Sequence, residues 1–354
     1  MGSNQMNPER LRRRSQSSAG YTGLMIVLIV LLVGAFFTAI CVGRYSIPIP
    51  DVLRIFASKL GFGSISKTWD QKAEGVIFTL RLPRTVGALL VGGALALSGG
   101  TYQGVFKNPL VAPDLLGVSS GACVGAALAI LLNLDSFSVQ AFAFVMGLGT
   151  VGLTVLIPRI LKNTSMTMLV LSGIIVKGIM DSAMGIIKYL ADPETQLASI
   201  TYWLMGSLTK VTPPDLYAIG PVILAGSILI ILLRWRINIL SLGDNEAKAL
   251  GVNIKVVRGV IILCATLITA SAVCICGTIG WVGLVIPHLS RMIAGQDNTR
   301  SIPVSFLMGA IFMVLIDTLA RVLTSMELPL SILTGIIGAP FYIIVLSGQR
   351  MRLS

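Results

Sequence analysis

Long uncharged, apolar stretches recur along the whole chain, separated by short segments that hold most of the charged residues. The first two run from Tyr21 to Gly43 and from Thr85 to Val105, and each can cross about 30 Å of hydrocarbon as a helix. Because lipid offers no water to peptide groups, a chain crosses it as helices or as a closed barrel. The unbroken apolar runs lack the alternation of barrel strands. The pattern therefore predicts an all-α polytopic membrane protein.

We expect about ten transmembrane helices, some of them short or interrupted, in one domain over residues 21–347. The expected spans are 21–43, 84–105, 115–132, 138–157, 166–190, 214–235, 257–278, 281–293, 302–323 and 332–347. Residues 1–20 and 348–354 are expected to be tails. Helix breaks are expected at Asn108–Pro109, Pro113, Gly277–Gly283 and Pro287. Such breaks are tolerated at membrane depth where they are buried or line a cavity, so a solute pathway is expected.

The charge distribution supports a membrane location. Only 12% of the residues are charged, against about a quarter in a soluble domain. The net charge of +12 could indicate nucleic-acid binding, but the Lys and Arg residues lie at span ends and form no basic face with interleaved aromatic residues. We therefore expect a lipid membrane and no nucleic acid as partner. The first span lacks a clear cleavage site, which is typical of an uncleaved anchor.

The positive-inside rule sets the expected orientation. With the N-terminus in the cytoplasm, the expected spans place sixteen Lys and Arg residues inside and ten outside. Seven of those ten lie in the segment 44–84. The even number of spans brings the C-terminus back inside, so both termini are expected to be cytoplasmic.

Arg81 and Arg84 stand out because membrane insertion gives no reason to place two arginines at the outer mouth of the second span. They could anchor to lipid headgroups or pair with Glu74. Alternatively, they could form a docking site for an acidic partner, since exposed charges guide encounter and register.

Two charged residues lie near the middle of the fifth span. Lys177 and Asp181 are one helical turn apart, and an intramembrane ionisable residue is by default a functional hypothesis. Their i, i+4 spacing also permits a structural ion pair. Both interpretations, a pathway contact and a structural pair, stay open. Asp317 and Arg321 repeat the spacing near the outer end of the ninth span, where we expect a structural pair close to water.

The sequence gives little support for a catalytic site. The single histidine, His288, has neither a zinc-binding partner histidine nor a Ser/His/Asp set, and no lysine follows a glycine, so a phosphate-binding P-loop is absent. The five cysteines fall in apolar runs, where we expect them to pack as small hydrophobic residues. We expect a non-enzymatic chain without catalytic residues, metal or cofactor. Any ATP hydrolysis is expected on another polypeptide.

The longest cytoplasmic link, residues 236–256, is expected to form one short helix. Asp244 or Asn245 can cap its start, and Gly251 suits the position just after its end. Such a helix could dock a cytoplasmic partner, and a simple connector is the alternative.

Six pieces of the chain, in order, resemble the permeases of ABC importers for iron siderophores, haem and cobalamin. They are Arg81–Thr85, Asn108–Ala122, Tyr202–Ser207, Leu242–Gly243 with Ala249–Val252, Gly280–His288 and Glu327–Pro329. The resemblance implies ten spans, a second permease subunit, cytoplasmic ATPase subunits and an extracytoplasmic solute-binding protein in a bacterial or archaeal cytoplasmic membrane. We expect a homodimer.

The resemblance favours a ferric siderophore as substrate, with haem, cobalamin or a smaller metal chelate as alternatives. A secondary transporter driven by protons or sodium, with Asp181 as the carrier site, is the competing class. Lys177 and Asp181 depart from the mostly uncharged residues of the family at these positions.

The resemblance also implies roles for particular residues. Arg81, Arg84 and Arg321 would face acidic residues of the solute-binding protein. The link matches the coupling helices that contact the ATPase, which implies contacts through Asp244, Glu246, Ala249, Leu250, Gly251 and Val252.

Overall fold

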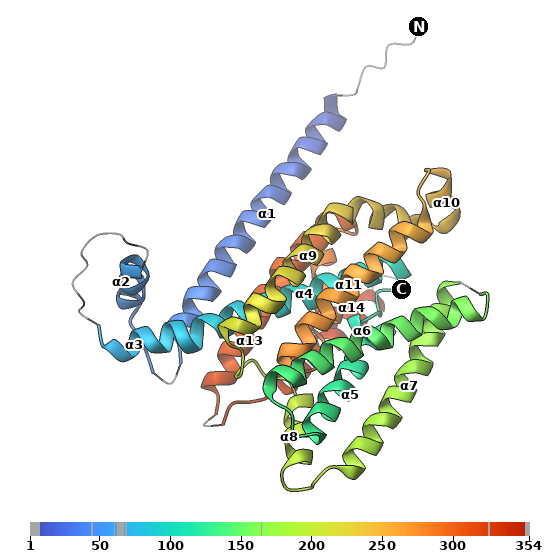
Figure 1. The fold of residues 1–354 in the computed structure, drawn as a ribbon. Coiled ribbons are helices and arrows are strands. Elements are labelled where there is room, and N and C mark those ends of the chain that lie inside the picture. The colour runs from blue at the N-terminus through green and yellow to red at the C-terminus, as the bar shows by residue number, and fades with distance from the viewer. Residues whose placement is uncertain are drawn as a thin grey trace.

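The computed structural model describes residues 8–43, 45–59, 61, 67, 69–163, 165–324 and 326–350. In these residues the fold consists of helices joined by turns and loops, without a strand, which confirms the all-α class (Figure 1). The ten helices that correspond to the expected spans are α1 (Pro8–Cys41), α4 (Leu82–Phe106), α5 (Val118–Leu131), α6 (Ser136–Ile160), α7 (Met166–Leu190), α9 (Pro213–Leu242), α11 (Ile254–Cys276), α12 (Val282–Ala294), α13 (Asn298–Val322) and α14 (Leu330–Arg350).

Seven helical segments of the described chain are long and apolar enough to cross a membrane, and α5, α12 and the start of α14 are shorter apolar helices. This agrees with the expected mixture of full and short spans. The remaining elements are α2 (Ile49–Lys59), α3 (Gln71–Gly75), the π-helix η1 (Val76–Arg81), the 3-10 helix η2 (Pro113–Leu116), α8 (Gln196–Leu204) and α10 (Asp244–Ala249). Helix α1 begins within the expected N-terminal tail, and residues 1–7 and 351–354 of the two tails lie outside the described residues.

The second span is longer than expected. Elements α3, η1 and α4 form one continuous helix over residues 71–106, so Arg81 and Arg84 lie inside a helix and not at its mouth. Pro83 has no N–H to donate, but it follows a π turn in which the Leu82 amide donates to the Ile77 carbonyl. This local change of hydrogen bonding allows the helix to continue through the proline.

Pro287 was expected to break a helix, but it lies inside α12. A proline at this position leaves the carbonyl of Gly283, four residues earlier, without its helical donor. The side chain of Gln103 on α4 supplies a replacement, with Nε2 at 3.4 Å from that carbonyl oxygen. The break expected at Gly277–Gly283 is confirmed, because residues 277–281 separate α11 from α12 and both Gly277 and Trp281 have positive φ angles.

Helices α4 and α11 form the centre of the bundle, with more of their length buried than α1 or α7 at the periphery. Helix α4 packs against α13, where Gly92 and Gly309 face each other. A Cβ atom on either residue would lie 2.2–2.3 Å from the carbonyl oxygen of the other. The two backbones are therefore in direct contact, which is typical of small residues at membrane helix interfaces.

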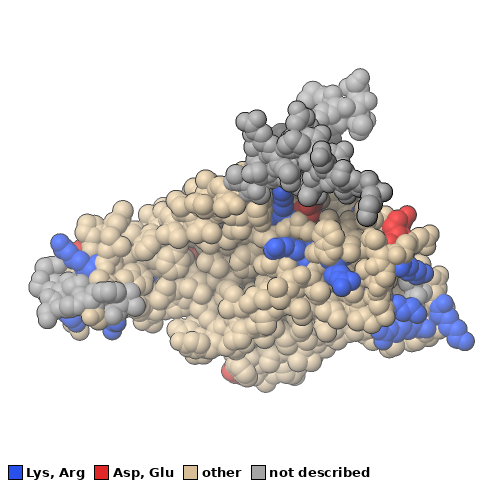
Figure 2. Space-filling model, turned by 90° about the horizontal axis from the view of Figure 1, so that it is seen from above, with Lys and Arg blue, Asp and Glu red and all other residues tan. Residues whose placement is uncertain are grey.

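Helix α9 has 30 residues and so spans about 45 Å between two distinct ends of the molecule. At one end, which we call the Glu327 end, lie the loops 205–212 and 323–329 and the last turns of α1 and α13. At the other, the α10 end, lie residues 243–253 (Figure 1). Figure 2 shows a broad region without Lys or Arg between the blue side chains at the left extreme of one face and those near its middle and right. Such a region suits contact with lipid.

Candidate functional site

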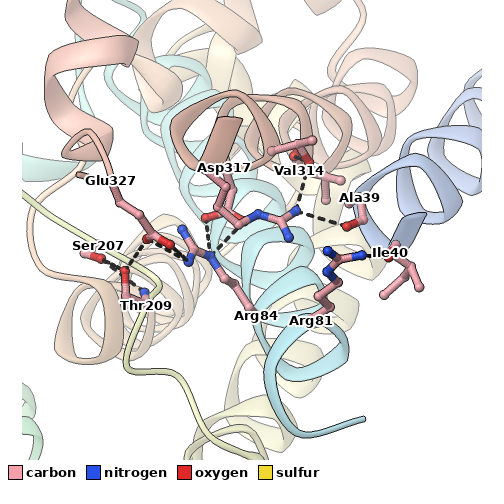
Figure 3. Close-up of polar contacts among 11 residues, drawn as sticks. Ala39, Ile40, Arg81, Arg84, Ser207, Thr209, Val314, Asp317 and Glu327 are labelled. Atoms are coloured by element: carbon pink, nitrogen blue, oxygen red, sulfur yellow. Dashed lines mark hydrogen bonds and ion pairs between the residues drawn. The ribbon is translucent and has the colours of Figure 1, made fainter. Parts of the chain in front are cut away.

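The Glu327 end contains a network of buried charges centred on Arg84 (Figure 3). Nε of Arg84, on α4, donates to Asp317 on α13 at 2.8 and 3.0 Å, and Nη1 donates to Glu327 at 2.8 and 3.0 Å. Nε of Arg321 lies 3.4 Å from Asp317. The expected pair of Asp317 and Arg321 is thereby confirmed. It was expected close to water, however, and the Asp317 side chain is only 1% exposed.

Arg81 and Arg321 hold the end of α1. Arg81 donates from Nη1 to the carbonyls of Ile40 (2.6 Å) and Cys41 (3.1 Å) and from Nη2 to that of Tyr45, and Arg321 donates to the carbonyl of Ala39 at 3.1 Å. The last carbonyls of a helix lack intrahelical donors, and its C-terminus carries partial negative charge. Two guanidinium groups therefore cap α1 and fix it to η1 and α13.

All three arginines expected to dock a partner are therefore buried and paired within the chain. The alternative pairing with Glu74 is wrong, because Glu74 instead accepts a hydrogen bond from Trp69 at 2.8 Å and lies 3.5 Å from Lys67. The actual partners of Arg84 lie 233 and 243 residues further along the chain, so no local pattern indicated them. Glu327 stood within one of the six motifs, but no role was expected for it.

Glu327 also contacts the loop that precedes α9. The Thr209 hydroxyl donates to its carboxylate at 2.8 Å, and burial alone would raise the pKa of this carboxyl. The positive charge of Arg84 and the hydrogen bonds from Thr209 and Arg84 outweigh burial and lower the pKa below its usual value. Glu327 is therefore ionised at neutral pH and links α4 to this loop.

A cavity of about 700 Å³ lies beside Glu327. Its wall combines the end of α5, the start of α6, helix α8, the loop 205–212, the end of α11 and residues 327–329, with Tyr202 and Trp203 as aromatic side chains. Polar groups from Gln140, Ser199 and Thr209 also border it. The cavity is wide enough for a small solute and is reached from the Glu327 end.

Lys177 and Asp181 do not form an ion pair with each other in the described chain, so the structural pair, one of the two open interpretations, is wrong. Lys177 Nζ lies 3.3 Å from Asp114, in the interrupted segment before α5. Long side chains on a helix point back toward its N-terminus, which directs Lys177 away from Asp181. Asp181 instead borders a second cavity, of about 390 Å³, together with Asp114, Ser119, Ser120 and Thr278. Asp181 therefore lies beside a cavity at membrane depth, and Lys177 pairs with Asp114 in the wall of the same cavity.

At the α10 end, the expected short helix is present but begins differently. Gly243, with a φ of 151°, precedes the first helical residue Asp244, so neither Asp244 nor Asn245 is the N-cap. Asp244 instead accepts hydrogen bonds from Arg258 on α11 at 2.6 and 3.3 Å, and the hydrogen bond from Arg258 lowers the pKa of its carboxyl. The link is also shorter than expected, because α9 continues to Leu242.

The end of this short helix follows the expectation. Gly251 has a φ of 73° and its amide donates to the Lys248 carbonyl at 2.9 Å, which confirms its position just after the helix. Ala247 and Val252 are buried and anchor the segment to the bundle. The other expected contact residues are exposed, namely Asp244, Glu246, Ala249, Leu250 and Gly251. Leu250 is 60% exposed, which leaves an apolar side chain uncovered in the single chain.

The cysteines pack as expected, since all five are buried and unpaired. In the described residues, no group of three His, Cys, Asp or Glu side chains is arranged to hold a metal ion. His288 is buried with its ring 6.1 Å from that of Tyr342, in a packing position.

Comparison with known proteins assigns a family to this arrangement. Residues 29–348 match the FecCD transport family. The molybdate import system permease protein MolB of Haemophilus influenzae is 40% identical over 323 residues, covering 91% of this chain and 94% of that protein. The hemin transport system permease protein HmuU of Yersinia pestis is 34% identical over 320 residues, covering 86% and 94%.

The solved structures agree with this assignment. An inward-facing metal-chelate type ABC transporter matches with a TM-score of 0.83 and 37% identity, covering 92% of this chain and 99% of that one. Sequence and fold thus match over nearly the full length of the chain. The chain belongs to the FecCD transport family and is a permease of the ABC importer class that its six motifs indicated.

Proposed function

We propose that this permease forms the membrane-spanning part of an ATP-driven importer that takes up an iron chelate, specifically a ferric siderophore, from an extracytoplasmic solute-binding protein. The observation that carries the proposal is the FecCD family match over residues 29–348. The similarity to a hemin permease and to a metal-chelate transporter supports an iron chelate as the class of substrate.

ATP hydrolysis belongs, in this proposal, to separate cytoplasmic subunits. The outward-facing residues Glu246, Ala249 and Leu250 would contact the ATPase, and Leu250 would fill an apolar pocket there. Asp244 and Val252, which were expected as contacts, would instead keep the segment in place through Arg258 and through burial. A short helix fixed at both ends can transmit a movement of the ATPase to α9 and α11.

The α10 end and both termini would then lie in the cytoplasm, and the Glu327 end would lie outside and receive the solute-binding protein. Arg81, Arg84 and Arg321 would contribute to docking there. Their internal hydrogen bonds mean that any direct contact requires a change of partner.

A second copy of the chain would complete the pathway. Lys177 is half exposed and Asp181 is exposed on α7, near the middle of a membrane span. Charged side chains are costly in hydrocarbon and generally face protein or water in membrane proteins. The charged face of α7 would therefore line a water-filled pathway between two permease subunits.

Molybdate is a second candidate substrate because of the 40% identity to a molybdate permease. The test is uptake by the permease, its ATPase and its solute-binding protein in proteoliposomes, with a ferric hydroxamate, hemin, cobalamin and molybdate offered separately. We expect ATP-dependent uptake of the ferric hydroxamate. Uptake of molybdate alone would contradict the iron-chelate proposal and leave the importer class intact.

A further inference from the structure

Arg84 has two carboxylate partners in different surroundings. Asp317 is 1% exposed, whereas Glu327 is 33% exposed and lies in the loop between α13 and α14. Arg81 and Arg321, in contrast, donate hydrogen bonds to backbone carbonyls at the end of α1. Among the three candidate docking arginines, Arg84 is therefore the one whose partner can be replaced from the water side.

Glu327 connects Arg84 to the wall of the large cavity. Its carboxylate accepts from Thr209, and both residues border the cavity of about 700 Å³. The same wall is held by backbone hydrogen bonds from Leu330 to Gly206 (3.0 Å) and from Ser331 to Met205 (3.2 Å). A displacement of Glu327 would thus loosen the contact between the start of α14 and the loop before α9.

We propose that Glu327 is an internal substitute for a carboxylate of the solute-binding protein. When that protein docks, one of its acidic side chains replaces Glu327 on Arg84, and the released Glu327 loop opens the cavity toward the delivered solute. This inference rests on the proposed docking at the Glu327 end. Beyond that docking, it names Glu327 as the residue that is displaced and links docking to the opening of the cavity.

The exchange is electrostatically feasible because Arg84 keeps its bond to Asp317 throughout. A buried charge that loses its last partner is strongly unfavourable, but Arg84 would pass from one partly exposed carboxylate to another. Glu327 would move from the guanidinium into water, where a carboxylate is well solvated. Charge pairs of this kind guide the register of a docking partner.

Glu327→Gln tests the exchange because it removes the competing charge and keeps the size of the side chain. A partly exposed ion pair contributes up to about 1 kcal/mol, so we expect the solute-binding protein to bind the variant about fivefold more tightly than the wild type. Glu194→Gln, in the exposed loop before α8, is the matched control and should leave the Kd unchanged. The probe is the solute-binding protein that cross-links to the intact transporter in native membranes. This protein is purified, labelled and titrated onto the permease–ATPase complex to measure the Kd.

Native cysteines supply a second measurement. Cys274 and Cys276 border the cavity and are 3% and 2% exposed, while Cys264 lies on the same helix away from it. Docking should increase maleimide labelling of Cys274 and Cys276 but not of Cys264, and Glu327→Gln should show increased labelling before docking.

The outcomes separate the two proposals. If the wild-type complex binds the protein and Glu327→Gln matches Glu194→Gln in affinity and labelling, the exchange is wrong while docking stands. If the wild-type complex does not bind the cross-linked protein at all, the proposed docking itself fails and the exchange fails with it.

Discussion

Arg84 and Asp317 are separated by 233 residues in the sequence, and their side chains meet at 2.8 Å in the buried end of the helical bundle. Asp317 also lies 3.4 Å from Arg321, so one carboxylate compensates two buried guanidinium groups. Removing one partner of a buried pair leaves a charge without compensation, which costs more than the pair itself contributes.

We predict that Asp317→Ala lowers the free energy of unfolding of the purified permease by about 3 kcal/mol. The matched control is Asp51→Ala, whose partner Arg54 is exposed, and we expect a change below about 1 kcal/mol. Denaturant titration in detergent, followed by tryptophan fluorescence, measures both. Equal stability of the two variants would show that the buried network contributes little to folding.

The network also affects how docking can be tested. Charge reversal of Arg81 would remove the cap on α1 as well as any contact with a partner, so a loss of docking in Arg81→Glu would not separate the two effects. We predict that Arg81→Glu lowers the thermal midpoint of the permease in detergent, whereas Lys162→Glu, at an exposed position, leaves it unchanged. A stable Arg81→Glu protein would mean that this cap is dispensable.

Leu250 offers a direct test of the α10 segment. It is largely exposed, so Leu250→Asp should fold normally and still lose most ATPase co-purification, because a carboxylate would be buried in the apolar contact. Lys255→Asp, an exposed position on the first turn of α11, should retain the ATPase. Pull-down of the tagged permease measures how much ATPase each variant retains. An ATPase still bound to Leu250→Asp would place the contact elsewhere.

The pair of Asp244 and Arg258 predicts a pH dependence. The pKa of Asp244 is lowered in the folded chain, so its contribution is present above the unfolded value of about 3.9 and is lost as pH falls through the lower folded value. Hydrogen exchange of residues 243–253, corrected for intrinsic rates, should therefore distinguish wild type from Asp244→Asn at pH 7 but not at a pH below the folded pKa of Asp244. A difference that persists there would rule out ionisation of Asp244 as the cause.

Asp181 distinguishes the importer from an ion-coupled carrier. In an ATP-driven importer no proton or sodium ion needs to bind this carboxylate, so Asp181→Asn should retain ATP-dependent uptake. A carrier that uses Asp181 would lose transport in the same variant. Uptake in proteoliposomes, with and without an ion gradient, separates the two results.

The helical fold could be predicted from the sequence because lipid forces apolar stretches into helices, and charged links mark their ends. The end of α10 could also be predicted, since Gly251 occupies a position with positive φ. The start was mispredicted because the carboxylate of Asp244 has a competing partner in Arg258 on the next helix.

The environment of the charged residues was harder to predict. Two arginines close to a span end suggested an exposed face, whereas packing of α1 and α13 against α4 buries Arg81 and Arg84. Lys177 likewise finds Asp114, 63 residues away, and not its helical neighbour Asp181. Local spacing shows only the pairs that are possible within one helix, whereas tertiary packing supplies partners from distant segments.

The most direct test of the account is uptake of a radiolabelled ferric hydroxamate into proteoliposomes that contain this chain with or without its ATPase subunits. We predict uptake only when the ATPase, ATP and the solute-binding protein are all present. Uptake by this chain alone, driven by an ion gradient, would contradict its role as the permease of an ATP-driven importer.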